Sequence, residues 1–507
     1  MQTKIHSLKS LVKIIEQEKK RGKKIIHCHG VFDLLHVGHI KHLQKAKELG
    51  DKLIITITAD QYINKGPGKP VFNQSLRSEA LAAIDVVDYV AINNTTTAIN
   101  PIQLLKPNIY CKGKDYKNAK DDITGEIKNE IKALKKFGGN IFYTEELTFS
   151  SSRLINRSTN FYSATQKKSL NKIRKKINFK NIKSSIDSFS KLKVLTIGEA
   201  IIDKYNFCEA IGKSGKEPIL VLKDSYEEQY FGGVLSIAKN IANFSNKVSV
   251  LSMIGEKKEY LKEINKYLPK NLKKYFVFKK NSPTIIKKRY VDLVSGSKLF
   301  GVYNFNDEIL SQKDENIFHK KLKILIKKSD LVIVSDYGHG LISEKSAKII
   351  CKYSKFLALN AQVNAANIGY HTIRNYNNFD TLIINEKEIR HEMRDKVTNV
   401  KKLMKNLSIE KNINNLIVTR GGKGSILYNN KKKKFFYGEG YALNITDKIG
   451  AGDTMLALIA PCIKSKIDPD TSLLISSLAA AQSIENFGNK FSINKISILK
   501  TLENIFK

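Results

Sequence analysis

Two short stretches of this sequence gather residues that can handle phosphate. The first, HCHGVFDLLHVGH at residues 27–39, holds four of the ten histidines of the chain. An apolar run leads into it, Gly30 permits a tight turn, and His36 and His39 flank Gly38 where a helical pattern begins. Imidazoles beside the free N–H groups of a helix N-terminus favour an anion and can neutralise charge on a phosphate during in-line attack. We therefore expect a triphosphate-binding site here.

The second stretch, DKIGAGDTM at residues 447–455, places two glycines around Ala451 immediately before an apolar helical run. Successive backbone N–H groups of Gly450, Ala451 and Gly452 would form an anion hole at the positive end of the helix dipole. Asp453 would lie in the first turn of that helix. A carboxylate at this point can take a proton from a sugar hydroxyl while the anion hole stabilises the transferring phosphoryl group.

Three further basic residues in the first half of the chain are candidates for phosphate binding. Lys41 follows the histidine motif on the same helix, although an exposed lysine of no special role is the alternative. Lys65 lies in a loop that glycines and prolines hold in shape, and Arg77 is one of only ten arginines and a candidate phosphate clamp. A metal site is the alternative for the histidines, but it lacks a carboxylate ligand at a recognised spacing. That site would use His27, His29, His36, His39 and His42.

The elements that must position these residues follow an alternating pattern of short apolar runs and helical segments. From residue 24 to residue 144 this pattern predicts a βαβ series and hence a parallel sheet covered by helices. A second such series begins at residue 193 and ends in helices after residue 450. Residues 217–233 and 284–305 have few helical signals and predict a small accessory sheet. We therefore expect an α/β protein with domains at 1–157 and 191–507, joined by a basic, partly helical linker at 158–190.

The composition limits the classes of function. The 507 residues include 42% apolar residues, enough for several cores, and no apolar run is long enough to span a membrane. The five cysteines are scattered, and no signal peptide is visible, so we expect a cytoplasmic protein. The net charge of +39 comes largely from dispersed lysines, which an AT-rich genome would produce. A nucleic-acid-binding protein remains an alternative function class, but the sequence has no aromatic-basic stacking motif to support it.

The first motif resembles a known family signature. Its pattern G-x-F-D-x-x-H-x-G-H, carried by Gly30, Phe32, Asp33, His36, Gly38 and His39, is similar to that of the cytidylyltransferase-like nucleotidyltransferases. The segments 65–77, 110–116 and 149–157 resemble the branch that makes nucleotide-activated heptose for lipopolysaccharide. The resemblance implies that Lys112 and Asp115 bind substrate and that Ser150, Ser151 and Ser152 bind phosphate or nucleotide. Phe149 and Lys114 depart from the pattern of that branch.

The second half resembles the ribokinase-like sugar kinases over about residues 190–507. The resemblance implies an ATP-dependent kinase that uses Mg²⁺ and dimerises through its lid. The implied residues are Asp203, Gly232 and Gly233 for the sugar, Asn385 and Glu388 for Mg²⁺ and its waters, Gly422 and Gly424 for the nucleotide, and Asp453 as the base. Ser236, Lys448 and Asn360 depart from the family pattern, so a degenerate kinase half that only binds a ligand or mediates dimerisation remains an alternative.

Taken together, the two halves resemble the bifunctional heptose-phosphate kinase/heptose-1-phosphate adenylyltransferases, with the domain order reversed. The resemblance implies two consecutive transferase reactions on small molecules. A sugar or sugar phosphate and ATP would give a sugar 1-phosphate, which would react with ATP or CTP to give a nucleotide sugar and pyrophosphate. Both reactions would require Mg²⁺.

Overall fold

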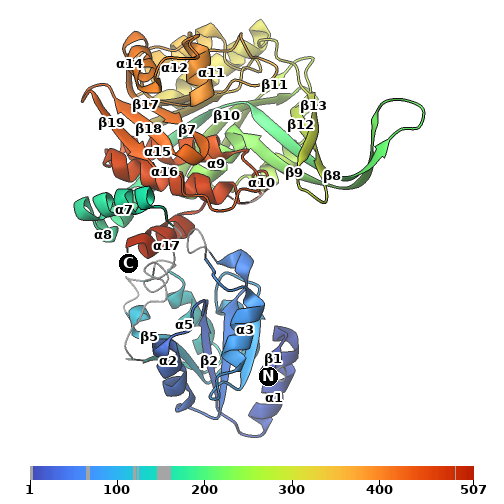
Figure 1. Ribbon diagram of the computed structural model, residues 1–507, viewed down its shortest axis with the longest axis vertical. Coiled ribbons are helices and arrows are strands. Elements are labelled where there is room, and N and C mark those ends of the chain that lie inside the picture. Colours follow the sequence, from blue (N-terminus) through green and yellow to red (C-terminus); the bar gives the residue numbers. More distant parts are fainter. Residues whose placement is uncertain are drawn as a thin grey trace. The chain divides into compact units, whose positions relative to one another are not determined.

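The chain folds into two compact units. A computed structural model describes residues 4–63, 69–117, 122, 125–144, 162–485, 487–490 and 492–506. The first unit comprises Met1–Ser163 together with Ile496–Lys507, and the second comprises Ala164–Lys495. Many of the elements of each unit are labelled in Figure 1. The units differ from the expected boundaries, because the helices expected to form a linker belong to the second unit and the last twelve residues belong to the first.

The linker helices join the second unit through ion pairs that the sequence pattern did not reveal. They are α7 (Ala164–Lys176) and α8 (Phe179–Ser188). Lys172 and Lys176 of α7 lie 3.0 and 2.6 Å from the carboxylate of Asp470, which is buried in α16 (Pro469–Ser483). The apolar residues Leu170 and Ile173 are buried on the same helix, so α7 packs as part of this unit.

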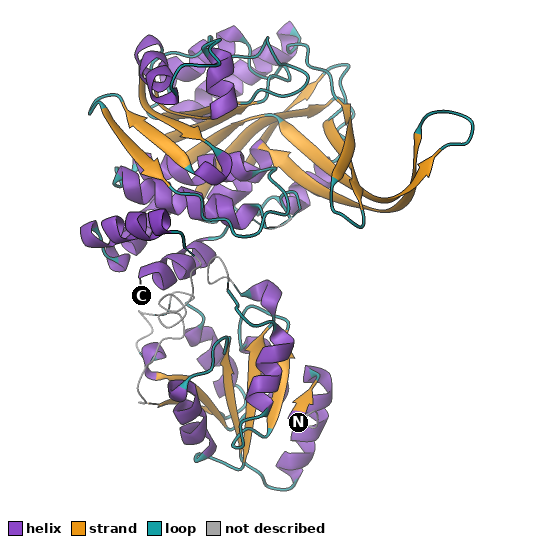
Figure 2. Ribbon diagram, viewed as in Figure 1, coloured by secondary structure: helices purple, strands orange, loops and turns teal. Residues whose placement is uncertain are grey.

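The first unit is built on a parallel sheet of six strands in the order β1-β4-β3-β2-β5-β6 (Figure 2). Its strands are β1 (Ile5–His6), β2 (Ile25–Gly30), β3 (Lys52–Thr58), β4 (Tyr89–Asn93), β5 (Ile109–Gly113) and β6 (Asn140–Thr144). The strand order reverses between β2 and β5. In open parallel sheets, ligands bind at the carboxyl ends of the strands where the order reverses.

Helices cover both faces of this sheet, because successive residues of each strand point to opposite faces. Ile26 and Ile55 pack in one cluster with α2 and α3, and their neighbours Ile25 and Ile54 pack in another with α1 and α4. The helices are α1 (Leu8–Lys20), α2 (Val37–Lys47), α3 (Gln74–Ala82), α4 (Ile99–Leu105) and α5 (Ile127–Lys135), with short 3-10 helices at Asp60–Tyr62 and Lys114–Tyr116. Helix α17 (Lys495–Phe506) belongs to this unit from Ile496 onward.

The second unit contains a sheet of nine strands in the order β11-β10-β7-β14-β15-β16-β17-β18-β19. All neighbouring pairs are parallel except β17-β18 and β18-β19. The strands are β7 (Lys193–Gly198), β10 (Lys247–Gly255), β11 (Lys273–Lys279), β14 (Leu331–Asp336), β15 (Leu357–Ala361), β16 (Phe379–Asn385), β17 (Ile413–Thr419), β18 (Ser425–Asn429) and β19 (Lys434–Gly438).

A second, smaller sheet in this unit has the order β13-β12-β8-β9 and is called the lid sheet below. It contains β8 (Ala200–Lys213), β9 (Leu220–Gly233), β12 (Ile285–Asp292) and β13 (Lys298–Asn304). Strands β8 and β9 form a long hairpin that projects from the unit (Figure 1). The expected accessory sheet therefore exists, with β8 added to it.

Helices pack on the nine-stranded sheet, and one of them, α15 (Ala451–Lys464), is buried over most of its length. It buries nine consecutive residues from Thr454 to Cys462. The other helices are α9 (Val234–Ala242), α10 (Leu261–Tyr267), α11 (Gln312–Lys327), α12 (Glu344–Tyr353), α13 (Glu386–Glu392) and α14 (Val400–Glu410), in addition to α16. Within the described part of the chain, no helix combines the length and the apolar character needed to cross a membrane.

Candidate active sites

A cleft of about 650 Å³ in the second unit brings most of the predicted kinase residues together. The lid sheet lines one part, the carboxyl ends of the central strands line the floor, and the start of α15 lines the middle. The predicted residues that line the cleft are Asp203, Gly233, Asn385, Glu388, Gly422, Gly424, Gly450, Ala451, Gly452 and Asp453. These residues span 250 positions of the chain, so the sheet topology has placed separate motifs around one cavity.

Asp453 lies in the first turn of α15, where its carboxylate faces the cleft. Gly450 precedes the helix with φ of 84°, a left-handed conformation that glycine adopts without strain. The hydroxyl of Tyr337 donates to both oxygens of Asp453, at 2.7 and 2.8 Å. Burial, reinforced by the nearby carboxylates of Asp203 and Glu388, raises the pKa of Asp453 to about 7. A carboxylate with this pKa is suited to accept a proton near neutral pH.

The lid sheet supplies two cations beside Asp203 that the sequence did not single out. Strand β12 pairs with β8 so that Lys287 lies opposite Asp203, and Arg289 lies two residues further along. Arg289 Nη1 donates to Asp203 Oδ1 at 2.5 Å, and both cations line the cleft. Burial lowers the pKa of Lys287. The alternation of Lys287 and Arg289 in a strand was the available signal, because residues two apart share a face.

Glycines line the cleft at two places, and Gly232 lies beside one of them without lining the cleft itself. A Cβ atom at Gly232 would lie 2.2 Å from Asp203 Oδ2, so a larger residue would displace that carboxylate. Gly233 has φ of 58° and begins the turn into α9. At the other end, Gly424 has φ of 76° and a Cβ atom there would lie 2.0 Å from the backbone oxygen of Gly438. Gly422 lies in the short 3-10 helix Gly421–Lys423 at the same end.

In the first unit, the histidine motif lies where the strand order reverses, at the carboxyl end of β2. Gly30 ends that strand, and a Cβ atom there would lie 2.9 Å from the ring of Phe32, which has a positive φ of 49°. His36 is the N-cap of α2, and its Nδ1 accepts a hydrogen bond from Gly38 N at 3.1 Å. The rings of His36 and His39 stack with centroids 3.9 Å apart.

The hydrogen bond from Gly38 determines which nitrogen of His36 carries the proton. Burial lowers the pKa of His36, so the ring is neutral at neutral pH. Because Nδ1 accepts from Gly38, the single ring proton of His36 lies on Nε2, which is therefore a donor. The motif thus presents a neutral N–H donor and a helix N-terminus on the same side of the sheet.

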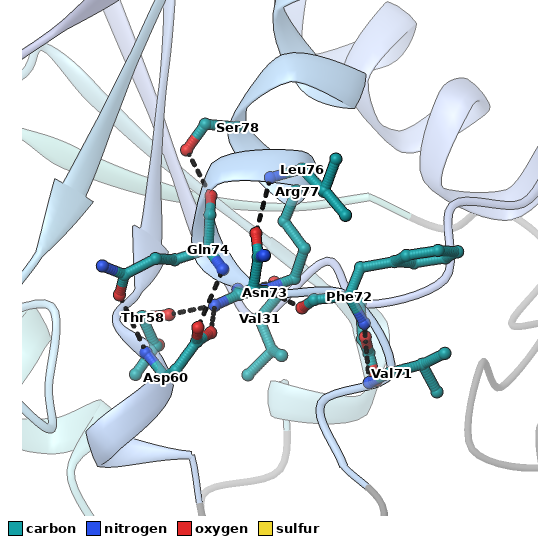
Figure 3. A network of polar contacts seen from close by, with 11 residues as sticks. Val31, Thr58, Asp60, Val71, Phe72, Asn73, Gln74, Leu76, Arg77 and Ser78 are labelled. Carbon is teal, nitrogen blue, oxygen red and sulfur yellow. Dashed lines mark hydrogen bonds and ion pairs between the residues drawn. The ribbon is translucent and has the colours of Figure 1, made fainter. Parts of the chain in front are cut away.

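Arg77 and Asp33 are placed differently from the predictions. The Arg77 side chain is 1% exposed, and its donors bind the backbone oxygens of Phe72, Val31 and Thr58 and the carboxylate of Asp60 (Figure 3). The predicted phosphate clamp is therefore a structural clamp, because its guanidinium is already bound by protein.

Asp33 also serves the loop that follows β3. Its carboxylate accepts hydrogen bonds from the backbone N–H groups of Val71 and Phe72, at distances between 2.8 and 3.0 Å. The predicted role of Asp33 in binding nucleotide or phosphate directly is thus replaced by one in holding residues 71–72 against the motif.

The remaining histidines of the cluster bind threonines rather than one another. Thr56 Oγ1 lies 2.8 Å from both His27 Nε2 and His29 Nδ1, and Thr144 Oγ1 lies 2.7 Å from His42 Nδ1. Burial and the nearby Lys112 lower the pKa of His27 to about 3 and that of His42 to about 4. Among the residues that the structure describes, no three His, Cys, Asp or Glu side chains are grouped to hold a metal ion.

Of the other predicted residues of the first unit, only Lys41 and Lys112 have described side chains. Lys112 is buried at the end of β5, with Nζ 3.5 Å from Glu130 Oε2, and Lys41 is exposed on α2. Lys65, Ser150, Ser151 and Ser152 lie outside the described residues, as does the side chain of Asp115.

Comparison with family models matches both units. Residues 191–496, more than half of the chain, match the model of the pfkB family carbohydrate kinases. The chain belongs to the pfkB family of carbohydrate kinases. Residues 27–167 match the cytidylyltransferase-like model, and this match precedes the pfkB match. The predicted α/β fold and the predicted order of the two domains are therefore confirmed.

Individual relatives agree with the family models. The bifunctional protein HldE of Geobacter metallireducens is 47% identical over 115 residues, which are 22% of this chain and 24% of that protein. HldE of Citrifermentans bemidjiense is 37% identical over 166 residues, 32% of each chain. The chain thus spans about a quarter to a third of the length of these curated relatives. Phosphofructokinase-2 from Escherichia coli, in a structure with potassium, covers 62% of this chain and 99% of its own at 13% identity and a TM-score of 0.51, which shows the fold alone.

The departures from the usual pattern leave the pfkB cleft intact. Asn360 lines the cleft, but its Nδ2 donates to the backbone oxygen of Ile383 at 2.8 Å, so its amide holds two neighbouring strands together. Ser236 is buried in α9, and Lys448 lines the cleft beside the anion hole. None of these three side chains replaces Asp453 or Asp203.

Asn385 and Glu388 form a reciprocal cap at the start of α13 in the pfkB unit. Asn385 Oδ1 accepts from Glu388 N at 2.8 Å, and Glu388 Oε2 accepts from Asn385 N at 2.7 Å. Burial raises the pKa of Glu388, whose side chain lines the cleft. A single carboxylate with an amide oxygen suits Mg²⁺, which keeps several waters and takes most other ligands from substrate phosphates. The two residues therefore fit an indirect role in holding the ion.

Proposed function

We propose that the pfkB unit phosphorylates the anomeric hydroxyl of a sugar phosphate, and that the first unit joins the resulting sugar 1-phosphate to a nucleotide. The nucleotide would come from ATP or CTP, with release of pyrophosphate. The observation that carries the proposal is that Asp453, the sugar-side residue Asp203 and the glycines at residues 450 and 452 all line one cleft. The HldE relatives are named bifunctional proteins, and the matches of this chain to a carbohydrate kinase model and a cytidylyltransferase-like model support a pairing of these two activities.

The kinase step would follow from the arrangement of the cleft. Asp453 accepts the proton of the sugar hydroxyl as the hydroxyl oxygen bonds to the γ-phosphorus of ATP. The backbone N–H groups of Gly450, Ala451 and Gly452 would stabilise the transferring phosphoryl group, because they lie at the N-terminal, positive end of the α15 dipole. Mg²⁺, held with its waters near Asn385 and Glu388, would neutralise charge on the phosphates of ATP.

The sugar end of the cleft favours a substrate that already carries a phosphate. Lys287 and Arg289 place two cationic side chains there, and only Arg289 forms an ion pair with Asp203. A neutral sugar needs hydroxyl-binding groups such as Asp203, whereas a phosphate also needs the cationic pair. This difference supports a sugar phosphate over a free sugar as the kinase substrate.

In the first unit, the neutral ring of His36 would donate its Nε2 proton to a phosphate oxygen of the nucleotide. The N-terminus of α2 would bind the same phosphate, and His39 stacks on His36 to fix the ring. No covalent intermediate with the protein is needed, because the sugar 1-phosphate attacks the α-phosphorus directly and pyrophosphate leaves.

We also propose that the protein is a homodimer formed through the lid sheet. Strand β13 is an exposed edge strand, and all seven of its residues are exposed to solvent. Apolar side chains are exposed on the hairpin and on β13. They include Ile211, Ile219, Leu220, Tyr226, Phe300 and Val302. Such a surface in a second copy would cover them. A cytoplasmic location is proposed because all five cysteines are free and both reactions consume nucleoside triphosphates.

The decisive experiment identifies the product. The protein is incubated with ATP, CTP, Mg²⁺ and a panel of heptose and hexose phosphates, and nucleotide sugars are identified by mass. We expect one sugar phosphate to yield ADP, pyrophosphate and a nucleotide sugar. Failure of every sugar to release ADP would contradict the kinase proposal, and failure of sugar 1-phosphates to release pyrophosphate would contradict the transferase proposal.

Two variants assign each reaction to its unit in the same assay. Asp453→Asn is expected to lower ADP release at least about 10²-fold and to leave pyrophosphate release from a supplied sugar 1-phosphate unchanged, because it removes only the kinase base. His36→Ala is expected to have the opposite pattern, with a loss of about 10²-fold in pyrophosphate release. Equal losses of both activities in either variant would show that the sites are not separate.

A further inference from the structure

The pfkB cleft contains a buried amide that neither the motifs nor the mechanism above uses. Asn489 lies in the short segment after α16, lines the cleft and is only 7% exposed. Its Nδ2 is buried and has no hydrogen-bond partner among the described residues. An amide donor left without a partner costs about 1–3 kcal/mol of stability, so its presence in a binding cleft points to an acceptor on a ligand.

Neighbouring contacts hold this amide in a defined place. Gly488 N donates to the buried carboxylate of Asp447 at 3.1 Å, and a Cβ atom at Gly488 would lie 2.5 Å from the ring of Tyr230. On the other side, Lys490 Nζ lies 3.0 Å from Glu228 Oε1. Both neighbours of Asn489 are therefore fixed, and the side chain between them is presented to the cleft.

The amide lies between the sugar end of the cleft and the anion hole. A Cβ atom at Gly450 would lie 2.3 Å from Asn489 Oδ1 and 3.6 Å from its Nδ2. A Cβ atom at Gly232 would lie 3.7 Å from the same Nδ2 and 2.2 Å from Asp203 Oδ2. The unpartnered donor is thus close both to a glycine of the anion hole and to the glycine beside the sugar-binding carboxylate.

We propose that Asn489 is a further phosphoryl-binding residue of the kinase reaction, donating from Nδ2 to an oxygen of the phosphoryl group during its transfer. The assignment rests on the proposed kinase function. In the step concerned, the sugar oxygen bonds to the γ-phosphorus, the bond from that phosphorus to the bridging oxygen of ADP breaks, and the hydroxyl proton passes to Asp453. The group in transit lies between sugar and anion hole, which is where this donor is placed.

The test compares Asn489→Leu and Asn489→Asp with the wild type by ADP release. We expect kcat to fall about 10²-fold in the Leu variant while KM for the sugar phosphate changes less than about 3-fold, because the lost contact forms in the transition state. The Asp variant, which keeps the shape but places a carboxylate beside the phosphoryl group, should be at least as impaired. Ser408→Ala is the matched control, since Ser408 Oγ in α14 is also buried without a partner in the described part of the chain but lies outside the cleft lining.

Stability separates this role from a structural one. Removing an unpaired buried amide should leave the thermal midpoint of the ligand-free Leu variant unchanged or higher, and pyrophosphate release should be unaffected. A kcat within about 3-fold of wild type in the Leu and Asp variants would overturn the assignment, as would a lost kcat accompanied by a lowered midpoint in both. A wild type that releases no ADP with any sugar phosphate would instead overturn the kinase function itself, and this assignment with it.

Discussion

In the pfkB cleft, charged side chains face a cavity, whereas in the first unit two charged residues at or near the histidine motif, Asp33 and Arg77, are enclosed by protein. Asp453, Lys287 and Arg289 line the cleft, and burial shifts the pKa of Asp453 toward neutrality. In the first unit, Arg77 and Asp33 are occupied by backbone groups, and the donors of the motif are a neutral imidazole and a helix N-terminus. If both sites bind phosphate as proposed, they would do so with different chemistry.

This difference shows that a charged residue in a motif has no fixed role. A buried charge is stabilised either by protein partners or by the ligand it awaits, and the sequence does not say which. Arg77 has found its partners within the fold, since three backbone oxygens and Asp60 surround its guanidinium. Lys287 forms no ion pair with a carboxylate of the described residues, and its Nζ lies over the rings of Tyr303 and Tyr337 at the cleft.

The sharpest test of the comparison is Arg77→Met. Removing a buried cation that holds four acceptors should lower the free energy of unfolding of the first unit by about 3–5 kcal/mol, because the acceptors remain buried without a donor. Hydrogen exchange of residues 58–63 and 69–78 would measure this loss, and ADP release by the pfkB unit should persist. Arg21→Met is the control, since its side chain is 71% exposed and its pair with Glu18 contributes about 0–1 kcal/mol. Unchanged exchange with a raised KM for the nucleotide would instead restore the phosphate-clamp role.

Sequence patterns were sufficient to predict both large sheets and most of the motif residues that line the cleft. They did not predict the cleft residues that lie outside these motifs. The alternation of apolar runs predicted two parallel sheets, and the glycines and Asp453 of residues 447–455 predicted the middle of the cleft. Tyr337 and Asn489 were missed because strand ends and a late segment bring them to α15 only in the folded chain. The role of Arg77 could not be predicted either, because its hydrogen-bond partners include residues from segments that are distant in the sequence.

The stability of Asp453→Asn should depend on pH in a way that tests the burial of this carboxyl. Burial raises the pKa of this carboxyl from its ordinary value of 3.8 to about 7, so the wild type loses stability as the pH rises from about 4 to about 7. Asparagine does not ionise, so the variant should gain up to about 4 kcal/mol over the wild type above pH 7 and almost nothing at pH 4. Thermal midpoints across this range would measure the difference.

Asp447→Asn is the matched control for that experiment and has the opposite sign. Although burial opposes it, hydrogen bonds from Lys298 and Tyr205 hold the pKa of Asp447 below its ordinary value. The carboxylate therefore stabilises the fold above pH 4, and its loss should lower the midpoint at neutral pH, with the difference disappearing as the pH falls below the folded pKa. Equal behaviour of the two variants would show that the carboxyls do not differ in environment.

The smallest expected effect is a difference between the two activities in their response to pH. Kinase kcat/KM should fall about tenfold for each pH unit below 7, because Asp453 acts as a base only when it has lost its proton. Pyrophosphate release should fall less steeply than ADP release below pH 7, because burial holds the pKa of His36 below its ordinary value and so keeps the ring neutral over more of this range. Measuring ADP and pyrophosphate release separately on the same protein compares the two responses. A parallel decline of both activities below pH 7 would mean that the protonation of a group common to both reactions, such as the substrate phosphate, determines the pH dependence. It would contradict the difference between the two sites that their contacts indicate.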